Sequence, residues 1–181
     1  MTKILAIAGS LRKHSTNKTL LKAAARLAPE GMEIVLYEGI GQLPFFNPDL
    51  KDPEPSQVTD FRARIRSVDG LIISSPEYAH GVPGVLKNAL DWLVGGSEIV
   101  GKPIALLNAS PRSSLAQDSL VEILKTMSSQ LVREAFVAVL LLGKNMTEEE
   151  ILSDPEMAGR LTQALEAFEM SIQFHNARIN G

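Results

Sequence analysis

The sequence predicts an α/β fold in which helices cover both faces of a parallel β-sheet. Five short apolar runs alternate with five segments whose apolar residues recur at helical spacing. The short runs are apolar throughout, as strands buried on both faces are, and do not alternate with polar residues. The 181 residues include no cysteine, so the sequence excludes a disulfide scaffold, Cys-ligated metals and thiol catalysis.

Each predicted strand precedes a predicted helix, which is typical of a parallel sheet built from successive βα units. The strands are expected at residues 4–8, 34–37, 71–73, 104–107 and 136–142. The helices are expected over residues 20–28, 58–68, 82–93, 120–131 and 157–172. Asp154 and Pro155 are a good N-cap and first-turn pair for the last helix. Two irregular segments remain, at residues 39–55 and 143–155, and we expect one domain spanning residues 1–181.

The composition is that of an ordinary globular domain, with 45% hydrophobic residues, 22% charged residues and a formal charge of −3. No basic stripe indicates nucleic-acid binding. No apolar run is long enough to cross a bilayer, and no signal peptide is visible. The three histidines lack nearby carboxylates at ligand spacing, so no metal site is expected. We therefore expect a cytoplasmic protein.

The first loop at the carboxyl end of the sheet, residues 9–17, indicates a phosphate site. Ligands of open parallel sheets bind beyond the carboxyl ends of the strands. This loop leads into a helix N-terminus, where free N–H groups and the helix dipole favour an anion. Gly9 would permit a tight turn, and Arg12 offers a planar charged fork suited to phosphate oxygens. Further donors are Ser10, Ser15, Thr16 and Asn17. The alternative is that Ser15 or Thr16 merely caps the helix and Arg12 is solvated.

The loop after the third predicted strand, residues 76–84, combines Pro, Glu, Tyr, His and Gly. Its prolines and glycines would stiffen and shape the backbone, and a rigid loop with exposed N–H groups can lie against a planar polar ring. Tyr78 could line an aromatic pocket, and His80 could stack or donate a hydrogen bond. The alternative is a connector with Tyr78 in the core and His80 on the surface.

Several common site motifs are absent. Only Gly9 of a G-x-G-x-x-G fingerprint is present. Residues 96–102 have P-loop spacing, but Pro103 follows where Ser or Thr is required, and the segment runs from helix to strand. Neither G-x-S-x-G nor H-E-x-x-H occurs, so esterase and zincin interpretations have no support.

Taken together, two motifs resemble the NAD(P)H-dependent FMN reductase family, whose relatives include quinone, azo-dye and chromate reductases. They are GSLRKHSTN at residues 9–17 and PEYAHGVPGVLKNALDWL at residues 76–93. The resemblance covers residues 4 to about 132. It implies a flavodoxin-like three-layer sandwich, with a five-stranded sheet in the order 2-1-3-4-5 and bound FMN. It also implies NAD(P)H as co-substrate and a homodimer or homotetramer.

The same resemblance implies roles for individual residues. Those expected to hold the FMN phosphate are Ser10, Arg12, Ser15 and Asn17. Those expected to border the isoalloxazine ring, largely through their backbone, are Pro76, Glu77, Tyr78 and His80. Ser110 would lie near the ribityl chain or the ring edge.

The chain departs from the family pattern at two places. Many members have Asn after P-E-Y, where this chain has Ala79. Many also have glycines after the serine that corresponds to Ser110, where this chain has residues 111–114, PRSS. Both departures bear on the nicotinamide side and on substrate preference. Arg112 could attract the extra phosphate of NADPH, or it could be a solvated or interface arginine.

The implied reaction passes hydride from NAD(P)H to FMN and then to a quinone, azo compound, free flavin or metal ion. Because the flavin supplies the redox chemistry, we assign no catalytic side chain. Two alternatives stay open: a non-enzymatic electron carrier of the flavodoxin type, and a flavin-binding regulatory module, because fold does not determine function.

Overall fold

The computed structural model describes residues 1–110, 114–141 and 146–180, apart from the side chains of residues 179 and 180. The strands are β1 (Thr2–Ala8), β2 (Met32–Leu36), β3 (Gly70–Ser74), β4 (Pro103–Asn108), β5 (Gln130–Leu131) and β6 (Val137–Ala138). The helices are α1 (Thr16–Arg26), α2 (Ser56–Arg66), α3 (Gly84–Asp91), α4 (Ser114–Thr126), α5 (Glu148–Ser153) and α6 (Pro155–Asn180). Three 3-10 turns are η1 (Ile40–Gln42), η2 (Pro48–Lys51) and η3 (Arg133–Ala135).

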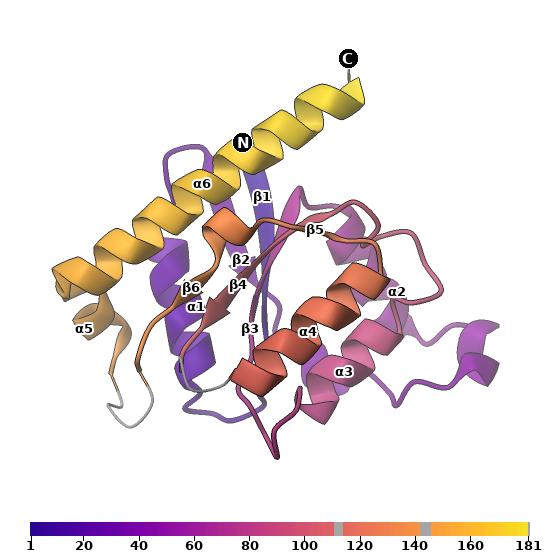
Figure 1. The fold of residues 1–181 in the computed structure, drawn as a ribbon. Helices are drawn as coiled ribbons and strands as arrows, with labels where there is room; N and C mark the ends of the chain where they lie inside the picture. The colour runs from indigo at the N-terminus through magenta and orange to yellow at the C-terminus, as the bar shows by residue number, and fades with distance from the viewer. Residues whose placement is uncertain (111–113, 142–145, 181) are drawn as a thin grey trace.

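The sheet has the order β2-β1-β3-β4-β5, and all its strand pairs are parallel. This confirms the predicted fold class and strand order. Figure 1 shows the three layers, with α1, α5 and α6 on one side of the sheet and α2, α3 and α4 on the other. Each layer of helices encloses its own hydrophobic core against the sheet.

The continuous apolar character of the strands follows from this two-sided burial. In β1, Ile4, Ala6 and Ala8 face the core under α1 and α6, whereas Leu5 and Ile7 face the core under α2 and α3. All five of these side chains are at most 4% exposed. A polar residue at any of these positions would lose its water without gaining a partner.

The far edge of the sheet differs from the prediction. The expected strand at residues 136–142 is replaced by two short segments, β5 and β6, which pair with the two halves of β4 and are separated by η3. Pairing continues past β6, because the N–H of Val139 donates to the Asn108 carbonyl at 2.8 Å. Short, interrupted edge strands are common because they limit pairing with other chains.

The predicted helix at residues 120–131 was too long. α4 ends at Thr126, and Leu131 belongs to β5. Ser128 adopts a φ of 58°, and the N–H of Ser129 donates to the Leu124 carbonyl at 3.1 Å. This is the hydrogen-bond pattern of a helix end that usually contains glycine. Because serine occupies the left-handed position, a prediction that relies on glycine as the helix-end signal does not find the end of α4.

The last helix covers the sheet closely. Asp154 caps α6 as predicted, accepting hydrogen bonds from the N–H groups of Glu156 and Met157 at 3.0 Å. Phe168 is fully buried, and a Cβ on Gly70 of β3 would lie 2.9 Å from its ring. Glycine therefore allows α6 to approach β3. None of the described helices has the length and apolar character needed to span a membrane.

Replacing Phe168 with alanine is expected to lower the free energy of unfolding by about 3–5 kcal/mol, because the ring is lost from a packed core. Phe174 lies on the same helix but is 66% exposed, so Phe174→Ala is a matched control that should cost less than about 1 kcal/mol. Urea unfolding of the two variants measures the difference. An equal loss of unfolding free energy in the two variants would contradict the burial of Phe168 between α6 and the sheet.

Candidate functional site

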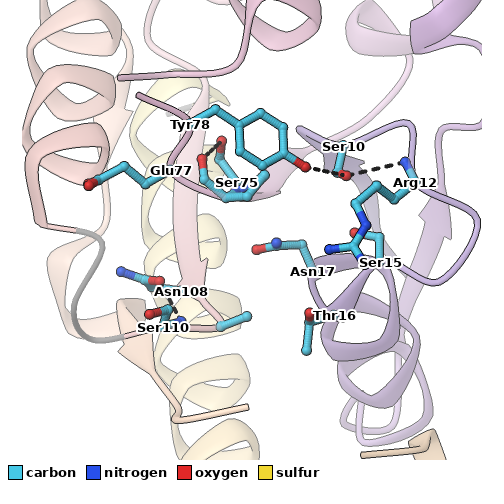
Figure 2. Close-up of a pocket in the computed structure, with 12 residues that line it drawn as sticks. Ser10, Arg12, Ser15, Thr16, Asn17, Ser75, Glu77, Tyr78, Asn108 and Ser110 are labelled. Atoms are coloured by element: carbon cyan, nitrogen blue, oxygen red, sulfur yellow. Dashed lines mark hydrogen bonds between the residues drawn. The ribbon is translucent and has the colours of Figure 1, made fainter. Parts of the chain in front are cut away.

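The loops after β1, β3 and β4 line one cleft at the carboxyl edge of the sheet. Figure 2 shows the β1 loop on one side, the β3 loop above and the β4 loop opposite. The lining residues are Ser10, Arg12, Ser15, Thr16, Asn17, Ser75, Pro76, Glu77, Tyr78, Asn108, Ala109 and Ser110. The carboxyl ends of parallel strands lie at the same edge of a sheet, which is why such sheets bind ligands there.

The β1 loop presents hydrogen-bond donors at the start of α1. Ser15 is the N-cap, and its side chain accepts from the N–H of Lys18 at 3.4 Å. The next two N–H groups, those of Thr16 and Asn17, have no acceptor among the described residues. Such N–H groups lie at the positive end of the helix dipole. The loop therefore offers a site for an anion as well as a helix cap.

A buried hydrogen bond connects the β1 loop to β3. The Ser74 hydroxyl donates to the Asn17 side-chain oxygen at 2.8 Å, and both residues are at most 6% exposed. Gly9 brings the two loops together, because a Cβ there would lie 2.7 Å from the Ser75 hydroxyl oxygen. Its φ is not among the positive values in the chain, so close approach, rather than a tight turn, requires glycine.

The β3 loop forms a small hairpin over the cleft. Tyr78 and Gly81 exchange backbone hydrogen bonds of 3.0 and 3.1 Å. Between them, Ala79 and His80 both have positive φ, 49° and 58°, as a type I′ turn requires. Alanine is not among the residues that favour this conformation. The Tyr78 hydroxyl lies 3.3 Å from the Ser10 hydroxyl, across the cleft.

Glu77 fastens the hairpin to α4 and does not point at the β1 loop. One carboxylate oxygen accepts from the N–H of Ala116 at 2.9 Å, and the other lies 3.2 Å from Nδ1 of His80. The hydrogen bond from Ala116 is the main reason why the pKa of the Glu77 carboxyl is held below its ordinary value. Glu77 therefore stays charged at neutral pH and orients two walls of the cleft.

The β4 loop supplies a buried hydroxyl. Ser110 is 7% exposed, and its N–H donates to the Asn108 side chain at 2.8 Å. The Ser110 hydroxyl oxygen has no hydrogen-bond partner in the described part of the chain. Buried polar atoms are seldom left without a partner, and this one lines the cleft, so it is available to a bound molecule.

These features fit FMN. The free N–H groups of α1, the Ser10 hydroxyl and Arg12 suit a phosphate, and the partnerless Ser110 hydroxyl suits a polar atom of the rest of the cofactor. The hairpin of residues 78–81 provides one wall with an aromatic side chain.

The cleft brings together most of the residues singled out in the sequence. Nine lie in its lining: Ser10, Arg12, Ser15, Thr16, Asn17, Pro76, Glu77, Tyr78 and Ser110. His80 does not line it; its side chain is 81% exposed at the hairpin tip. Arg112 lies outside the described residues. Ser75, Asn108 and Ala109 also line the cleft; the loop motifs do not point to them, but their place at strand ends could have.

The comparisons with known proteins bear directly on this cleft. A family model described as NADPH-dependent FMN reductase matches residues 2–140, more than half of the sequence. The chain belongs to this family. The match includes all three loops that line the cleft.

Individual relatives agree with the family. An NAD(P)H-dependent FMN reductase of Pseudomonas aeruginosa is 43% identical over 111 residues, and a 2-hydroxy-1,4-benzoquinone reductase of Burkholderia is 42% identical over 111 residues. Each match covers 60% of this chain and only 60% of the relative's length. The structure of FerB, a flavoenzyme NAD(P)H:(acceptor) oxidoreductase from Paracoccus denitrificans, superposes with a TM-score of 0.77 and 28% identity. It covers 97% of this chain and 99% of FerB.

Ser110→Ala is expected to weaken FMN binding about 3- to 10-fold, the loss of one neutral hydrogen bond. The flavin-free protein should keep its free energy of unfolding, because the deleted hydroxyl has no partner among the described residues. Ser129→Ala should lower the free energy of unfolding and leave the FMN affinity unchanged, since the Ser129 hydroxyl donates to the Leu124 carbonyl at 2.8 Å, far from the cleft. Flavin titration and urea unfolding of both variants measure this. A destabilised Ser110→Ala protein with unchanged FMN affinity would contradict the assignment.

Proposed function

We propose that the chain is an FMN-dependent oxidoreductase that takes hydride from NAD(P)H and passes electrons to a quinone-type acceptor. The observation that carries the proposal is the cleft, where Arg12 converges with helix N–H groups and a buried hydroxyl that have no partner in the described ranges. Membership of the FMN reductase family and the likeness to FerB support it.

The β1 loop would hold the phosphate of FMN. The N–H groups of Thr16 and Asn17 would donate to its oxygens, together with the hydroxyls of Ser10 and Ser15. The guanidinium of Arg12 would add charge and a second pair of donors. The side chain of Asn17 is already engaged by Ser74, so its contribution would come from its N–H group.

The β3 and β4 loops would hold the ring and the ribityl chain. Pro76 and Tyr78 would border the isoalloxazine ring, while the Glu77 carboxylate keeps the hairpin against α4. Ser110 would donate to a polar atom of the ribityl chain or of the ring edge. His80, at the exposed tip, would meet a substrate only from outside the cleft.

FMN would supply hydride acceptance and donation when bound, so the protein's tasks are binding, orientation and electrostatics. The buried Ser74–Asn17 hydrogen bond holds the β1 and β3 loops together, and the hydrogen bond from Ala116 to Glu77 holds the β3 hairpin against α4. No side chain of the cleft needs to act as a nucleophile.

The proposed acceptor is a quinone, because the Burkholderia relative is named a benzoquinone reductase. Azo compounds, free flavin and metal ions are further acceptors to be tested. A non-enzymatic electron carrier is the alternative, and it would not oxidise NAD(P)H without a separate reductase. We also propose a cytoplasmic location and a homodimer or homotetramer. Self-association is supported by a largely apolar surface between α3 and α4 that includes Val94, Ile123 and Met127.

Arg12→Ala is expected to weaken FMN binding about 10- to 100-fold, because a charge-assisted hydrogen bond contributes about 1.5–3 kcal/mol. Arg133 is exposed in η3 and is not part of the cleft lining. Arg133→Ala therefore serves as the control and should leave the FMN affinity unchanged. Flavin fluorescence titration of the apoprotein measures both. Equal affinities of the wild type and Arg12→Ala would remove Arg12 from the phosphate site.

The same preparations test the activity. The wild-type protein loaded with FMN should lose its visible flavin absorbance when NADPH or NADH is added without air, and a benzoquinone should restore it. A flavin spectrum that neither cofactor bleaches would favour the electron carrier. A protein that takes up no FMN would contradict the proposal altogether.

A further inference from the structure

A second cavity adjoins the β1 loop on the side away from the β3 hairpin. Its volume is about 550 Å³, within the range of ordinary small-ligand sites, roughly 300–1,000 Å³. It lies between α1 and the start of α5, and Ser15 and Thr16 line both this cavity and the cleft. The two spaces therefore meet at the point where the phosphate of FMN would lie. The binding of FMN makes no use of the second one.

The walls of this cavity carry an excess of positive charge. Lys13, Lys18 and Lys22 all line it, with Glu148 as the one acidic residue among the described lining. Lys18 is neutralised by Glu38 at 2.9 Å, and Glu148 by Arg26 at 3.3 Å. Lys13 and Lys22 have no carboxylate partner in the described ranges. In a chain with a formal charge of −3, this is a local site for an anionic group.

The cavity also has an apolar side. Met146, half-buried, lines the wall contributed by the segment before α5, and methionine side chains adapt to flat or irregular apolar surfaces. A ligand that fits the cavity thus combines a negative charge near α1 with an apolar group near Met146. A nucleoside monophosphate has this combination.

We propose that this cavity binds the adenylate half of a flavin dinucleotide, so that the chain takes FAD as well as FMN. The proposal rests on the proposed function, because the flavin and its first phosphate would occupy the cleft. The second phosphate would pass over Thr16, the shared border labelled in Figure 2, towards Lys13 and Lys22. The adenine would then lie against Met146.

The shared border favours an attached adenylate over a free one. A free adenine nucleotide has the same chemistry, but it would lose more translational and rotational freedom on binding than an adenylate tethered to a bound flavin. The two sources differ in an experiment, because adenosine 5′-monophosphate can bind alongside FMN but not alongside FAD.

The test compares the affinities of apoprotein for FMN and FAD, measured by flavin fluorescence, in three proteins: the wild type, Lys22→Glu and Lys125→Glu. Lys22 lies in the second turn of α1 and lines only the second cavity, whereas Lys125 is exposed on α4. Adenosine 5′-monophosphate is titrated into the FMN-loaded wild type as a separate arm.

The proposal predicts that FAD binds the wild type within about tenfold of FMN. Lys22→Glu should weaken FAD about tenfold or more and FMN less than about threefold, since one reversed charge near a phosphate is worth about 1–2 kcal/mol. Lys125→Glu should change neither affinity.

Four results would overturn the proposal. The first is FAD binding more than about a hundredfold weaker than FMN binding, and the second is an equal effect of Lys22→Glu on the affinities for both flavins. Either result would leave the proposed function intact. Tight binding of adenosine 5′-monophosphate to the FMN-loaded protein, with weak FAD binding, would assign the cavity to a free nucleotide. Failure to bind either flavin would overturn the proposed function and this inference together.

Discussion

Burial of one parallel sheet on both faces is the constraint on which the rest of the molecule depends. Because β1, β3 and β4 are covered by helices on each side, polar groups of these strands can meet a ligand only where the strands end. The chain therefore concentrates its free donors in the loops that leave the carboxyl edge. The Ser74–Asn17 hydrogen bond and the close approach at Gly9 then hold two of these loops together.

Several locally unfavourable features of this structure lie at the same edge. Within the described residues, the buried Ser110 hydroxyl has no partner and the first N–H groups of α1 have no acceptor, and Ala79 and His80 have left-handed backbones. Each feature is unfavourable for a protein without a ligand. Their convergence on one cleft and on the hairpin beside it is what a binding site pre-arranged for a cofactor produces, and local rules are most often broken at functional sites.

The fold could be predicted where burial of an element requires a regular pattern of apolar residues in the sequence. The first four strands and the cap at Asp154 were predicted from apolar runs and capping chemistry, and the strand order came from the family resemblance. The errors lie where the determining contact is not local. The end of α4 at Ser128 lacks its usual glycine, and the two-part edge strand depends on pairing with β4. The residues of α5 were expected to be irregular, although Thr147 and Glu150 form a capping box.

The candidate site shows the same division. Loop motifs placed nine residues in the cleft, but only the structure shows that Glu77 faces Ala116, that His80 is solvated and that Gly9 is needed for close approach. The directions of the Glu77 and His80 side chains depend on the turn at residues 78–81 and on the hydrogen bond from Ala116 of α4 to Glu77. The close approach at Gly9 depends on Ser75 of the neighbouring loop.

The most direct test of the central claim is a crystal structure of the chain grown with FMN. The account predicts the phosphate at the N-terminus of α1, within hydrogen-bond distance of the Thr16 and Asn17 N–H groups. It also predicts a polar atom of the same molecule on the Ser110 hydroxyl. A flavin bound elsewhere, or bound in the cleft with its phosphate away from α1, would contradict the account.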